Sequence, residues 1–554
     1  MTGLLTTIRR RVGSEIGVVR KDHGGRLRVC LVYPNTYFVG MSSLGFQAVY
    51  YLLNSDPSVV CERAFVPEED SRESSPLRQG FGAQGVESRK SRDRQARAGS
   101  RSLPALMSYE SQMPLNQFDV IAFSVSYELD YVNVPRILRL AKLPVMAAER
   151  GDEHPLVIAG GVAISINPEP LADLIDAFVI GEVEEIVGSL VGALRIGAHD
   201  KTEGLRALAA VEGVCISKSR ESKVESRKPE VERAEPNLKS RILTPSSAVQ
   251  RQYLRDLDAW PTHSRILTNE TEFGDLFLVE VSRGCARGCK FCVTPSCYWP
   301  LRWRSADSIV TSARAGLEHR EAIGLVGAAV SDHPDIDEIA RRIVGMGARL
   351  SVSSLRADSV SDALIDALVR SGAKSITIAP EAGGERLRRA IGKGISDEQI
   401  LDSLRRAAAA GIREAKLYFM VGLPGEGEDD VAAIPALARR CLDTAGLSRV
   451  TVAAGAFVPK PNTPYESEGM VPVAELSRRL RLIKEELRSD RRVRVALESP
   501  NWSYLEGALS RGDRRLGAVI ADAEANGGNL AAWRKAFEKA GLTMEQFAGR
   551  EGIP

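Results

Sequence analysis

The chain has 554 residues, 44% of them hydrophobic and 26% charged, which is the balance of a globular protein too long for one ordinary core. Its 74 lysines and arginines nearly cancel 72 aspartates and glutamates, so the formal charge of +2 gives no global attraction to nucleic acid or an anionic membrane. No apolar run is long enough to span a bilayer, and the first residues lack a signal-peptide pattern. We therefore expect a cytoplasmic protein of roughly two to four domains.

The first 200 residues alternate strand-like apolar runs with segments of helical periodicity. Five strands are expected at 27–33, 59–65, 119–127, 155–161 and 176–182, with helices near 43–54, 130–142 and 183–195. Alternating strands and helices form a parallel sheet covered on both faces. Residues 1–200 are therefore predicted to be a doubly wound, Rossmann-like domain.

Two stretches, 68–104 and 217–240, interrupt this pattern. They are rich in Ser, Arg, Glu, Lys, Gly and Pro and poor in large apolar residues. Such segments bury too little surface to offset the entropy lost on ordering. Acidic and basic residues are interspersed in both, which favours disordered insertions over basic arms for nucleic acid. The second stretch lies in a connector expected over 201–275.

A second and more regular alternation begins at residue 276. Six strands are expected at 276–282, 322–330, 348–356, 375–381, 414–422 and 449–458, with helices at 306–319, 335–346, 361–371, 397–410 and 427–443. Gly372 and Gly411 stand where helix C-caps are needed. These units predict a partial (β/α)6 TIM-like barrel over 276–474, with its chemistry at the carboxyl ends of the strands. Residues 475–554, with one possible strand at 492–498, are predicted to form a small, mostly helical domain.

Three of the eight cysteines, Cys285, Cys289 and Cys292, crowd into SRGCARGCKFC directly after the first barrel strand. In a reducing compartment this clustering indicates metal or redox chemistry rather than disulfides. Three thiolates can hold a 4Fe–4S cluster and leave one iron open, whereas an electron-transfer cluster uses four cysteines. The amino and carboxylate groups of S-adenosylmethionine can bind that open iron, and an electron from the cluster then cleaves the sulfonium C–S bond. The alternatives are a zinc site with Cys297 as fourth ligand and a ferredoxin-type centre, whose run of four cysteines ending in Cys-Pro is missing.

The Cys-x3-Cys-x2-Cys spacing, with Phe291 before the last cysteine, resembles the signature of the radical S-adenosylmethionine (radical SAM) superfamily. Further segments resemble successive strand-end motifs of one subgroup, in which a cobalamin-binding-type domain precedes the barrel. They are GAAVSDHPD (327–335), SVSSLRAD (351–358), IAPEAGGERLRRAIGKG (378–394), LYFMVGLPGEGEDD (417–430) and FVPKPNTPY (457–465), together with 33–47, 122–134 and 159–185 in the first domain. The resemblance covers nearly the whole chain apart from the two insertions. It implies an enzyme that reductively cleaves S-adenosylmethionine to a 5′-deoxyadenosyl radical, supplied with electrons by a partner such as flavodoxin or ferredoxin.

The resemblance also implies where S-adenosylmethionine binds. Glu381 matches the family carboxylate that contacts the ribose, and GLPGE (422–426) matches the glycine-rich turn beside the adenine, on which Phe291 could pack. The family's Gly-Gly-Glu turn after the second strand is replaced here by GAAVSD. The amino group is therefore expected at Ser331, at Asp332 or at a backbone carbonyl. The resulting set is Phe291, Ser331, Asp332, Glu381, Gly422, Gly425 and Glu426.

The first domain is expected to bind cobalamin in the crevice at the carboxyl ends of its strands. Glycine turns after the fourth and fifth strands would admit a nucleotide tail, and two serines after the third strand would supply hydrogen bonds. The candidate residues are Ser124, Ser126, Gly160, Gly161, Gly181 and Glu182. The Asp-x-His-x-x-Gly motif of many cobalamin domains is absent. We therefore expect binding without an axial histidine.

The leading hypothesis is a cobalamin-linked radical enzyme for methyl transfer or another radical modification of a substrate that the sequence does not identify. One alternative is a methylthiotransferase acting on RNA or protein. That reaction needs three further cysteines in the first domain for a second cluster, where only Cys30 and Cys61 lie, with Cys215 in the connector. The other alternative is a non-catalytic Fe–S scaffold or sensor, which would not cleave the cofactor.

Overall fold

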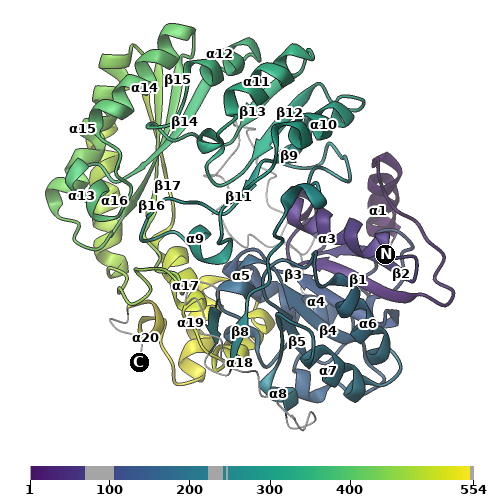
Figure 1. Cartoon of the computed structure of the whole chain (residues 1–554). Helices are drawn as coiled ribbons and strands as arrows, with labels where there is room; N and C mark the ends of the chain where they lie inside the picture. Colours follow the sequence, from purple (N-terminus) through teal and green to yellow (C-terminus); the bar gives the residue numbers. More distant parts are fainter. Residues whose placement is uncertain (1, 69–104, 222–240, 245–246, 550–554) are drawn as a thin grey trace, which may run out of the picture.

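The computed structural model describes residues 2–68, 105–221, 241–244 and 247–549, and it contains two α/β units with a group of C-terminal helices beside both (Figure 1). Most of the two predicted low-complexity stretches, 68–104 and 217–240, lies outside the described residues. The described start of the second contradicts the expected disorder: Ser217 and Arg220 are buried, and Arg220 pairs with Asp176 at 2.8 Å. In the part of the chain that the structure describes, no helix is long and apolar enough to cross a membrane.

The first unit is built on a six-stranded sheet in the order β2-β1-β3-β4-β5-β6. The five predicted strands are confirmed as parallel neighbours: β1 (Leu27–Tyr33), β2 (Val59–Phe65), β3 (Val120–Ser124), β4 (Leu156–Gly160) and β5 (Ala177–Val179). A sixth strand, β6 (Val214–Ile216), pairs antiparallel with β5, so the sheet continues into the stretch expected as a connector. The chain reverses its direction across the sheet between β1 and β3, and ligands of doubly wound sheets bind at such a switch point.

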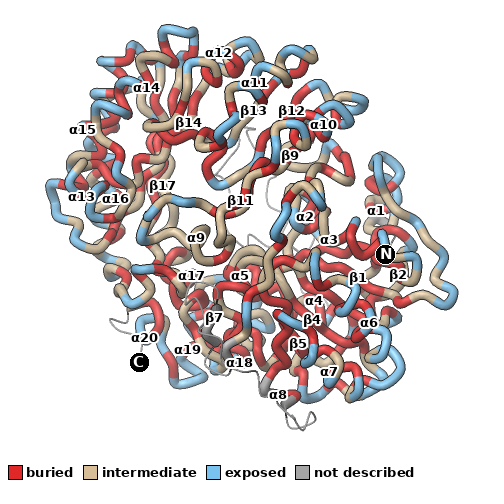
Figure 2. Tube along the Cα trace, viewed as in Figure 1, coloured by how far each residue is buried: buried red, intermediate tan, exposed pale blue. Residues whose placement is uncertain are grey.

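Helices cover both faces of this sheet, as the sequence predicts. Alternate residues of β1 separate to the two faces, because side chains of a strand point to opposite sides: Val29 and Leu31 enter one apolar core, and Cys30 and Val32 enter the other. One face is covered by α1 (Thr2–Ser14), α3 (Leu44–Ser55), α6 (Val187–Gly197) and α7 (Lys201–Ala209), and the other by α4 (Asn133–Leu140) and α5 (Val162–Ile166). The strands are accordingly buried almost throughout (Figure 2).

The second unit is a curved parallel sheet. All six predicted strands are confirmed: β9 (Leu276–Glu280), β12 (Ala322–Val326), β13 (Arg349–Val352), β14 (Ser375–Glu381), β15 (Glu414–Val421) and β16 (Arg449–Ala456). An isolated parallel bridge between Leu355 and Ile378 links the β13 edge to β14. A seventh strand, β17 (Val493–Leu497), was expected in the C-terminal domain but pairs parallel with β16, where it satisfies the backbone groups at that edge.

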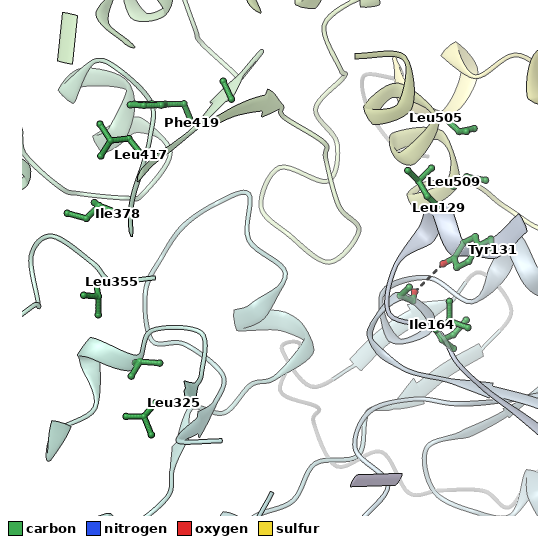
Figure 3. Close-up of a cluster of buried hydrophobic side chains, with 14 of the residues drawn as sticks. Leu129, Tyr131, Ile164, Leu325, Leu355, Ile378, Leu417, Phe419, Leu505 and Leu509 are labelled. Atoms are coloured by element: carbon green, nitrogen blue, oxygen red, sulfur yellow. Dashed lines mark hydrogen bonds between the residues drawn. The ribbon is translucent and has the colours of Figure 1, made fainter. Parts of the chain in front are cut away.

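Helices return the chain along the outer face of this sheet. They are α10 (Ala306–Gly316), α11 (Ile336–Gly345), α12 (Asp362–Arg370), α14 (Asp397–Ala410), α15 (Glu428–Ala445) and α16 (Val473–Leu487), with the short α13 (Glu385–Ala390) after β14. Gly411 ends α14 with a φ of 116°, which confirms the predicted cap. The buried core of this unit includes Leu325 of β12, Leu355 after β13, Ile378 of β14, and Leu417 and Phe419 of β15 (Figure 3). The carboxyl ends of all the strands therefore meet at one rim.

The remaining elements are short. They are α2 (Tyr37–Met41) and α8 (Lys218–Glu221) in the first unit, the hairpin β7 (Arg241–Thr244) and β8 (Ser247–Gln250), the antiparallel pair β10 (Ser282–Arg283) and β11 (Arg302–Trp303), and α9 (Thr294–Cys297). The cysteine motif lies between β10 and α9.

Of the C-terminal helices, α17 (Pro500–Ser510) and α18 (Leu516–Ala525) pack against the first unit, while α19 (Leu530–Lys539) packs on α18 and α20 (Glu545–Ala548) packs on α17. Leu505 and Leu509 of α17 lie beside Leu129 of the first unit (Figure 3). Lys460, which follows β16, bonds to Glu128 at 2.7 Å and to Glu506 at 2.8 Å. One half-buried lysine thus ties the barrel to the first unit and to α17.

Candidate functional site

The three clustered cysteines lie on a loop at the carboxyl end of the first barrel strand, and each is partly exposed. The backbone N–H of Arg287 donates to Cys285 Sγ at 3.4 Å, and that of Cys292 donates to the carbonyl of Cys289 at 3.2 Å. Burial raises the pKa of Cys285 and of Cys289, and the neighbouring Cys292 raises both further. The structure therefore brings these three thiols together on one loop.

The cysteine loop is held by the segment that follows α13. The N–H of Lys290 donates to the carbonyl of Ile391 at 2.9 Å, and the N–H of Tyr465 donates to the carbonyl of Lys290 at 3.2 Å. Gly392 has a φ of 75°, and a Cβ there would lie 2.2 Å from the carbonyl oxygen of Gly288. Only glycine fits so close an approach of two backbones.

The described residues contain no set of three or more His, Cys, Asp or Glu side chains that converges on one metal ion. The zinc alternative requires the sulfur of Cys297 and the three clustered sulfurs to lie about 2.3 Å from one ion, and this geometry does not support it. Cys297 is 3% exposed at the end of α9, and burial raises the pKa of its thiol to about 12. In a cubane, by contrast, each cysteine binds a different iron, which leaves the sulfurs apart.

Charged residues at neighbouring strand ends bind the cysteine loop. Arg287 lies between the first two cysteines, and its guanidinium bonds to Asp332 at 2.8 and 2.9 Å. It also approaches Asp358 at 3.4 Å, and Asp358 in turn accepts two bonds of 2.9 Å from Arg356. Burial alone would raise the pKa of Asp332, but Arg287 holds it below its usual range. The loop is thus anchored to the ends of β12 and β13 by a chain of alternating charges.

Glu381 ends β14 in a left-handed backbone conformation with a φ of 71°, beside a register shift in its pairing with β15. A non-glycine residue rarely adopts this conformation, and such strain is concentrated at functional sites. Its carboxylate bonds to Lys393 at 3.1 Å. Burial raises the pKa of Glu381, whereas Lys393 lowers it, and the same lysine lowers the pKa of Cys289. Glu381 therefore lies close to the cysteine loop.

An apolar cluster forms beside this carboxylate, and Phe291 packs against it. Its buried members come from the segments after β14, β15 and β16: Ala382, Leu387, Ile391, Leu423, Phe457 and Tyr465. Leu423 belongs to the predicted adenine turn. The aromatic ring before the last cysteine and the glycine-rich turn therefore share one apolar surface.

The side chains expected to hold the two ends of S-adenosylmethionine already have partners. Glu426 accepts from the N–H of Gly422 at 2.6 Å and from Arg479 at 2.7 Å, so its carboxylate closes the turn in which it lies. Ser331 is buried, and its hydroxyl lies 2.9 Å from that of Ser359. Gly425 has a φ of 76°, and a Cβ there would meet no neighbouring atom. Contact of any of these residues with a cofactor stays a prediction.

A cavity of about 440 Å³ lies between the two units, at the carboxyl ends of the strands of the first sheet. All six predicted cobalamin residues line it: Ser124, Ser126, Gly160, Gly161, Gly181 and Glu182. On the barrel side the wall includes Arg283, Cys297 and Tyr298, which flank the cysteine loop in the chain. The cavity and the cysteine loop are therefore adjacent parts of one region.

The three cavity glycines differ in what a side chain at their position would contact. Gly161 and Gly181 have φ values of 107° and 99°, and a Cβ would lie 2.4 Å from the carbonyl oxygen of Val125 and 2.2 Å from that of Gln252, respectively. Contact with the protein backbone is therefore sufficient to explain glycine at both positions. At Gly160 a Cβ would meet nothing closer than 3.4 Å. Gly160 is therefore the position where a missing side chain leaves space on the cavity side.

Glu182 is a structural junction. Its carboxylate accepts from Arg302 at 2.8 and 2.9 Å, from Arg283 at 2.8 Å and from the N–H of Leu254 at 2.9 Å. Burial would raise its pKa, but these arginines hold it below the usual range. Glu182 thus ties the first sheet to β10 and β11.

The sequence analysis missed the apolar rim of the cavity. Among the described residues, six large apolar side chains are exposed, and three of them, Tyr51, Trp260 and Val326, line this cavity. Trp260 lies in the expected connector, where nothing in the sequence marks it as a ligand contact. None of the chain's six histidines, all of them described, lines the cavity. The sequence analysis also did not single out three charged residues near the cysteine loop, although the motifs CARGC, LRAD and GKG contain them: Arg287, Arg356 and Lys393.

The remaining cysteines of the first unit are core residues. Cys30, Cys61 and Cys215 are buried in β1, β2 and β6, and burial raises the pKa of Cys30 and Cys61 well above the usual value. The described residues therefore contain no second cysteine cluster in this unit.

The family model described as "Radical SAM proteins, N-terminal" matches residues 89–216, and the model "Radical SAM superfamily" matches residues 279–438. An uncharacterized protein of Methanocaldococcus jannaschii is 30% identical over 410 residues, which are 73% of this chain and 80% of that protein. Methylthiotransferases among the curated relatives match about 27% of this chain at 26% identity.

Two solved structures have the same fold at low identity. The radical S-adenosylmethionine methyltransferase TsrM from Kitasatospora setae, with cobalamin and a [4Fe-4S] cluster bound, has a TM-score of 0.51 at 14% identity and covers 93% of this chain and 100% of its own. The cobalamin-dependent S-adenosylmethionine radical enzyme OxsB, with aqua-cobalamin and S-adenosylmethionine bound, has a TM-score of 0.50 at 13% identity and covers 93% of this chain and 70% of its own. The chain therefore belongs to the radical SAM superfamily of enzymes, and it shares with these two structures a fold in which the barrel follows a Rossmann-like domain.

Proposed function

We propose that this enzyme holds a 4Fe–4S cluster on Cys285, Cys289 and Cys292, cleaves S-adenosylmethionine there, and uses cobalamin in the domain cavity to transfer a methyl group to a substrate. One observation carries the proposal. The cavity lined by the predicted cobalamin residues also has in its wall Arg283, Cys297 and Tyr298, which flank the loop with the three thiols in the chain. Two cofactors bound in these places would face one another across the junction of the two units.

The residues of the cysteine loop fit a cluster with one open iron. Three thiols are available and the fourth, on Cys297, stays buried and protonated. When bound, a reduced cluster supplies the electron that cleaves the C–S bond of S-adenosylmethionine. Arg287 and Lys393 place positive charge beside the thiols, which favours their deprotonated, iron-binding form.

The strand ends around the loop fit S-adenosylmethionine. Glu381 would accept hydrogen bonds from the hydroxyls of the ribose. The apolar surface shared by Phe291 and Leu423 would cover the adenine. Asp332 would attract its ammonium group, in competition with Arg287. The glycine turn at Gly422 would let the backbone approach the flat base.

The cavity fits part of a corrinoid. Its volume is in the range of cofactor sites, which are concave, largely apolar and equipped with few polar groups. Neither Ser124 nor Ser126 makes a side-chain hydrogen bond within the described residues. Both hydroxyls would be available to the cofactor, and Tyr51, Trp260 and Val326 would be covered by it. When bound, cobalamin supplies a carrier for the methyl group.

The test is anaerobic reconstitution with iron and sulfide, followed by iron analysis and by assay of 5′-deoxyadenosine and methionine after reduction with dithionite. Ala at Cys285, Cys289 or Cys292 should abolish both the cluster and cofactor cleavage, because each thiol binds its own iron. Cys297→Ala is the matched control and should keep both. A cluster that survives the loss of any one of the three thiols would contradict the proposal, and a cluster without cleavage would indicate the scaffold or sensor alternative.

The methylthiotransferase alternative is not favoured by the structure. It requires a second cluster in the first unit, but Cys30, Cys61 and Cys215 are separately buried core thiols. The relatives named for that activity match only 27 to 37% of the chain.

A further inference from the structure

Glu498 lies on the inner face of the barrel sheet, at its carboxyl rim. On β16 and β17 the paired residues Ala454 and Leu497 belong to or pack against the apolar core between the sheet and its helices. Side chains alternate between the two faces of a strand, so the next residues, Gly455 and Glu498, face inward. Gly455 is in turn paired with Met420 of β15. Met420, Gly455 and Glu498 therefore form one inward-facing row across three neighbouring strands.

This row lies between the two predicted cofactor sites. At one end, Met420 packs against the apolar cluster that is predicted to cover the adenine. At the other end, Glu498 lies close enough to Glu506 for the two charges to interact, and Glu506 accepts from the hydroxyl of Tyr127 at 2.5 Å. Tyr127 directly follows Ser126, which lines the cavity predicted for cobalamin. A substrate that reaches both cofactors would therefore lie beside Glu498.

Gly455 gives the carboxyl of Glu498 its place. A Cβ on Gly455 would lie 2.2 Å from Oε2 of Glu498, and the three atoms nearest to that Cβ all belong to Glu498. The backbone of Gly455 does not have a left-handed φ, so its conformation does not require glycine. The missing side chain instead lets the carboxyl extend from β17 across β16, toward the surface predicted for adenine.

The carboxyl of Glu498 has no partner of its own within the described residues. No N–H or O–H group donates to it, and no Lys, Arg or His forms an ion pair with it. The titratable groups that face it are Glu506 of α17, Lys460 after β16, and Tyr127 and Glu128 of the first unit. Lys460 is bonded to Glu128 at 2.7 Å and to Glu506 at 2.8 Å, so it already serves two other carboxylates. The ionised form of Glu498 is therefore left without a compensating cation from the described chain.

We propose that Glu498 binds a cationic nitrogen of the substrate, an ammonium or guanidinium group, and so holds the substrate between the two cofactors. The inference rests on the proposed function, because that function places one cofactor on each side of the row. Charge-assisted bonds from N–H groups to a carboxylate are short and strong, and a guanidinium can bind both oxygens. A neutral group would leave the charge of Glu498 uncompensated, and Glu498 and Glu506 would both repel an anionic one.

The experiment uses the full-length reconstituted protein and small probes of similar size: butylammonium, butylguanidinium and the neutral butyramide. Binding of each probe is measured by NMR titration at pH 6 and at pH 8. The cations should bind the wild type more tightly than butyramide does. Burial and the nearby Glu506 raise the pKa of Glu498 to about 7, and the ionised form is the one that binds a cation. The affinity for both cations should therefore rise on the order of tenfold from pH 6 to pH 8, while that for butyramide should stay constant.

Glu498→Gln keeps the shape of the protonated side chain, so the fold should tolerate it. At pH 8 this variant should bind both cations on the order of tenfold more weakly than the wild type does, because a charge-assisted bond is lost. The dependence of affinity on pH should disappear as well. Glu318→Gln, at an exposed position of the barrel, is the matched control and should bind all probes like the wild type.

Gly455→Ala moves the carboxyl without removing it, because the new Cβ would lie 2.2 Å from Oε2 of Glu498. The affinity for both cations should fall several-fold, whereas its rise with pH should remain. Gly345→Ala is the matched control, since a Cβ at this exposed end of α11 would meet no neighbouring atom. It should bind the cations like the wild type.

A wild type that binds neither cation, or binds them no more tightly than butyramide, would overturn the proposal. So would a pH-dependent affinity that survives in Glu498→Gln, because another group would then bind the cation. Preference for one of the two cations would support the proposal and identify the substrate group as an ammonium or a guanidinium. Failure of the wild type to cleave S-adenosylmethionine with dithionite would refute the proposed function, whereas the probe titration would still decide whether Glu498 binds a cationic nitrogen.

Discussion

Glu498 shows how a single residue at this rim is set by its surroundings. It follows β17, its N–H donates to the carbonyl of Ala454 at 3.0 Å, and its carboxyl lies over Gly455, where a Cβ would be 2.2 Å from Oε2. Burial, together with the nearby Glu506, raises its pKa to about 7. Lys460 does not offset this effect because it is bonded to Glu128 and Glu506. Glu498 therefore changes its charge near neutral pH.

The protonated form of Glu498 is the one that the fold prefers, so its contribution to stability is complete below its unfolded pKa of about 4.5 and is lost as pH rises through about 7. The full difference is about 3 kcal/mol. Glu498→Gln imitates the protonated form and should match the wild type at pH 4.5. It should be more stable at pH 8 by up to about 3 kcal/mol, measured from urea unfolding midpoints.

The control for this prediction is Glu318→Gln, at an exposed position on the outer side of the barrel. It should leave the difference between the two pH values as in the wild type. An advantage of Glu498→Gln that is equal at both pH values would contradict the titration and indicate better packing instead.

At the scale of elements, the barrel is a conventional scaffold and its chemistry comes from the loops at one rim. The cysteine loop has no regular structure of its own before α9 and is positioned by Ile391, Tyr465 and the Asp332–Arg287 pair. The turn Gly392–Gly394 brings its backbone against the backbone of the cysteine loop, at Gly392 and Gly288. Iron binding should therefore depend on a turn that contains no ligand.

Gly392→Ala tests this dependence. The new Cβ would lie 2.2 Å from the carbonyl oxygen of Gly288, so the cysteine loop must move. We expect iron incorporation to fall several-fold, measured by iron and sulfide analysis after reconstitution. Gly394→Ala is the matched control, because Gly394 has a similar left-handed φ of 65° but open space around it. Both variants should lose about 1 kcal/mol of stability through backbone strain, and only Gly392→Ala should lose iron. Equal iron in both would mean that the turn does not position the loop.

At the scale of the whole molecule, the candidate site exists only where the two units meet. Glu182 joins β5 to β10 and β11, Lys460 joins the barrel to the first unit and to α17, and Asn167 donates to the carbonyls of Ser510 and Gly512 at 3.0 and 2.7 Å. The C-terminal helices therefore hold the first unit against the barrel. The cavity takes its walls from both units.

Titration of the full-length protein with hydroxocobalamin, followed by absorbance and gel filtration, tests this cavity. Gly160→Val should weaken binding about tenfold or more, because the side chain would fill space at a strand end without a backbone clash. Gly192→Val, on the exposed side of α6 with no atom nearby, is the control and should bind like the wild type. Replacing all six histidines should leave the visible spectrum of the bound corrinoid unchanged. Absence of any corrinoid from the folded protein fraction would refute cobalamin binding.

The strands of both sheets and the cysteine loop could be predicted from the sequence because their signals are local. Apolar periodicity located β1 to β5 and all six expected barrel strands. The reason is that burial of one face of a strand or helix produces a regular pattern of apolar residues along a short stretch of sequence. The glycines at 372 and 411 likewise marked helix ends, whereas the cluster on Cys285, Cys289 and Cys292 stays a prediction from their spacing.

Only the tertiary structure showed which of these residues already have partners within the fold. Gly161, Gly181, Glu182 and Glu426 look like site residues in the sequence, but backbone and ion-pair partners distant in the chain already occupy them. Conversely, Trp260 is unremarkable in a connector and lines the cavity, and β17 joins the barrel because its backbone partners lie on β16. The physical reason is the same in each case: a local pattern fixes whether a side chain is buried, whereas its partner is set by contacts between segments that only folding brings together.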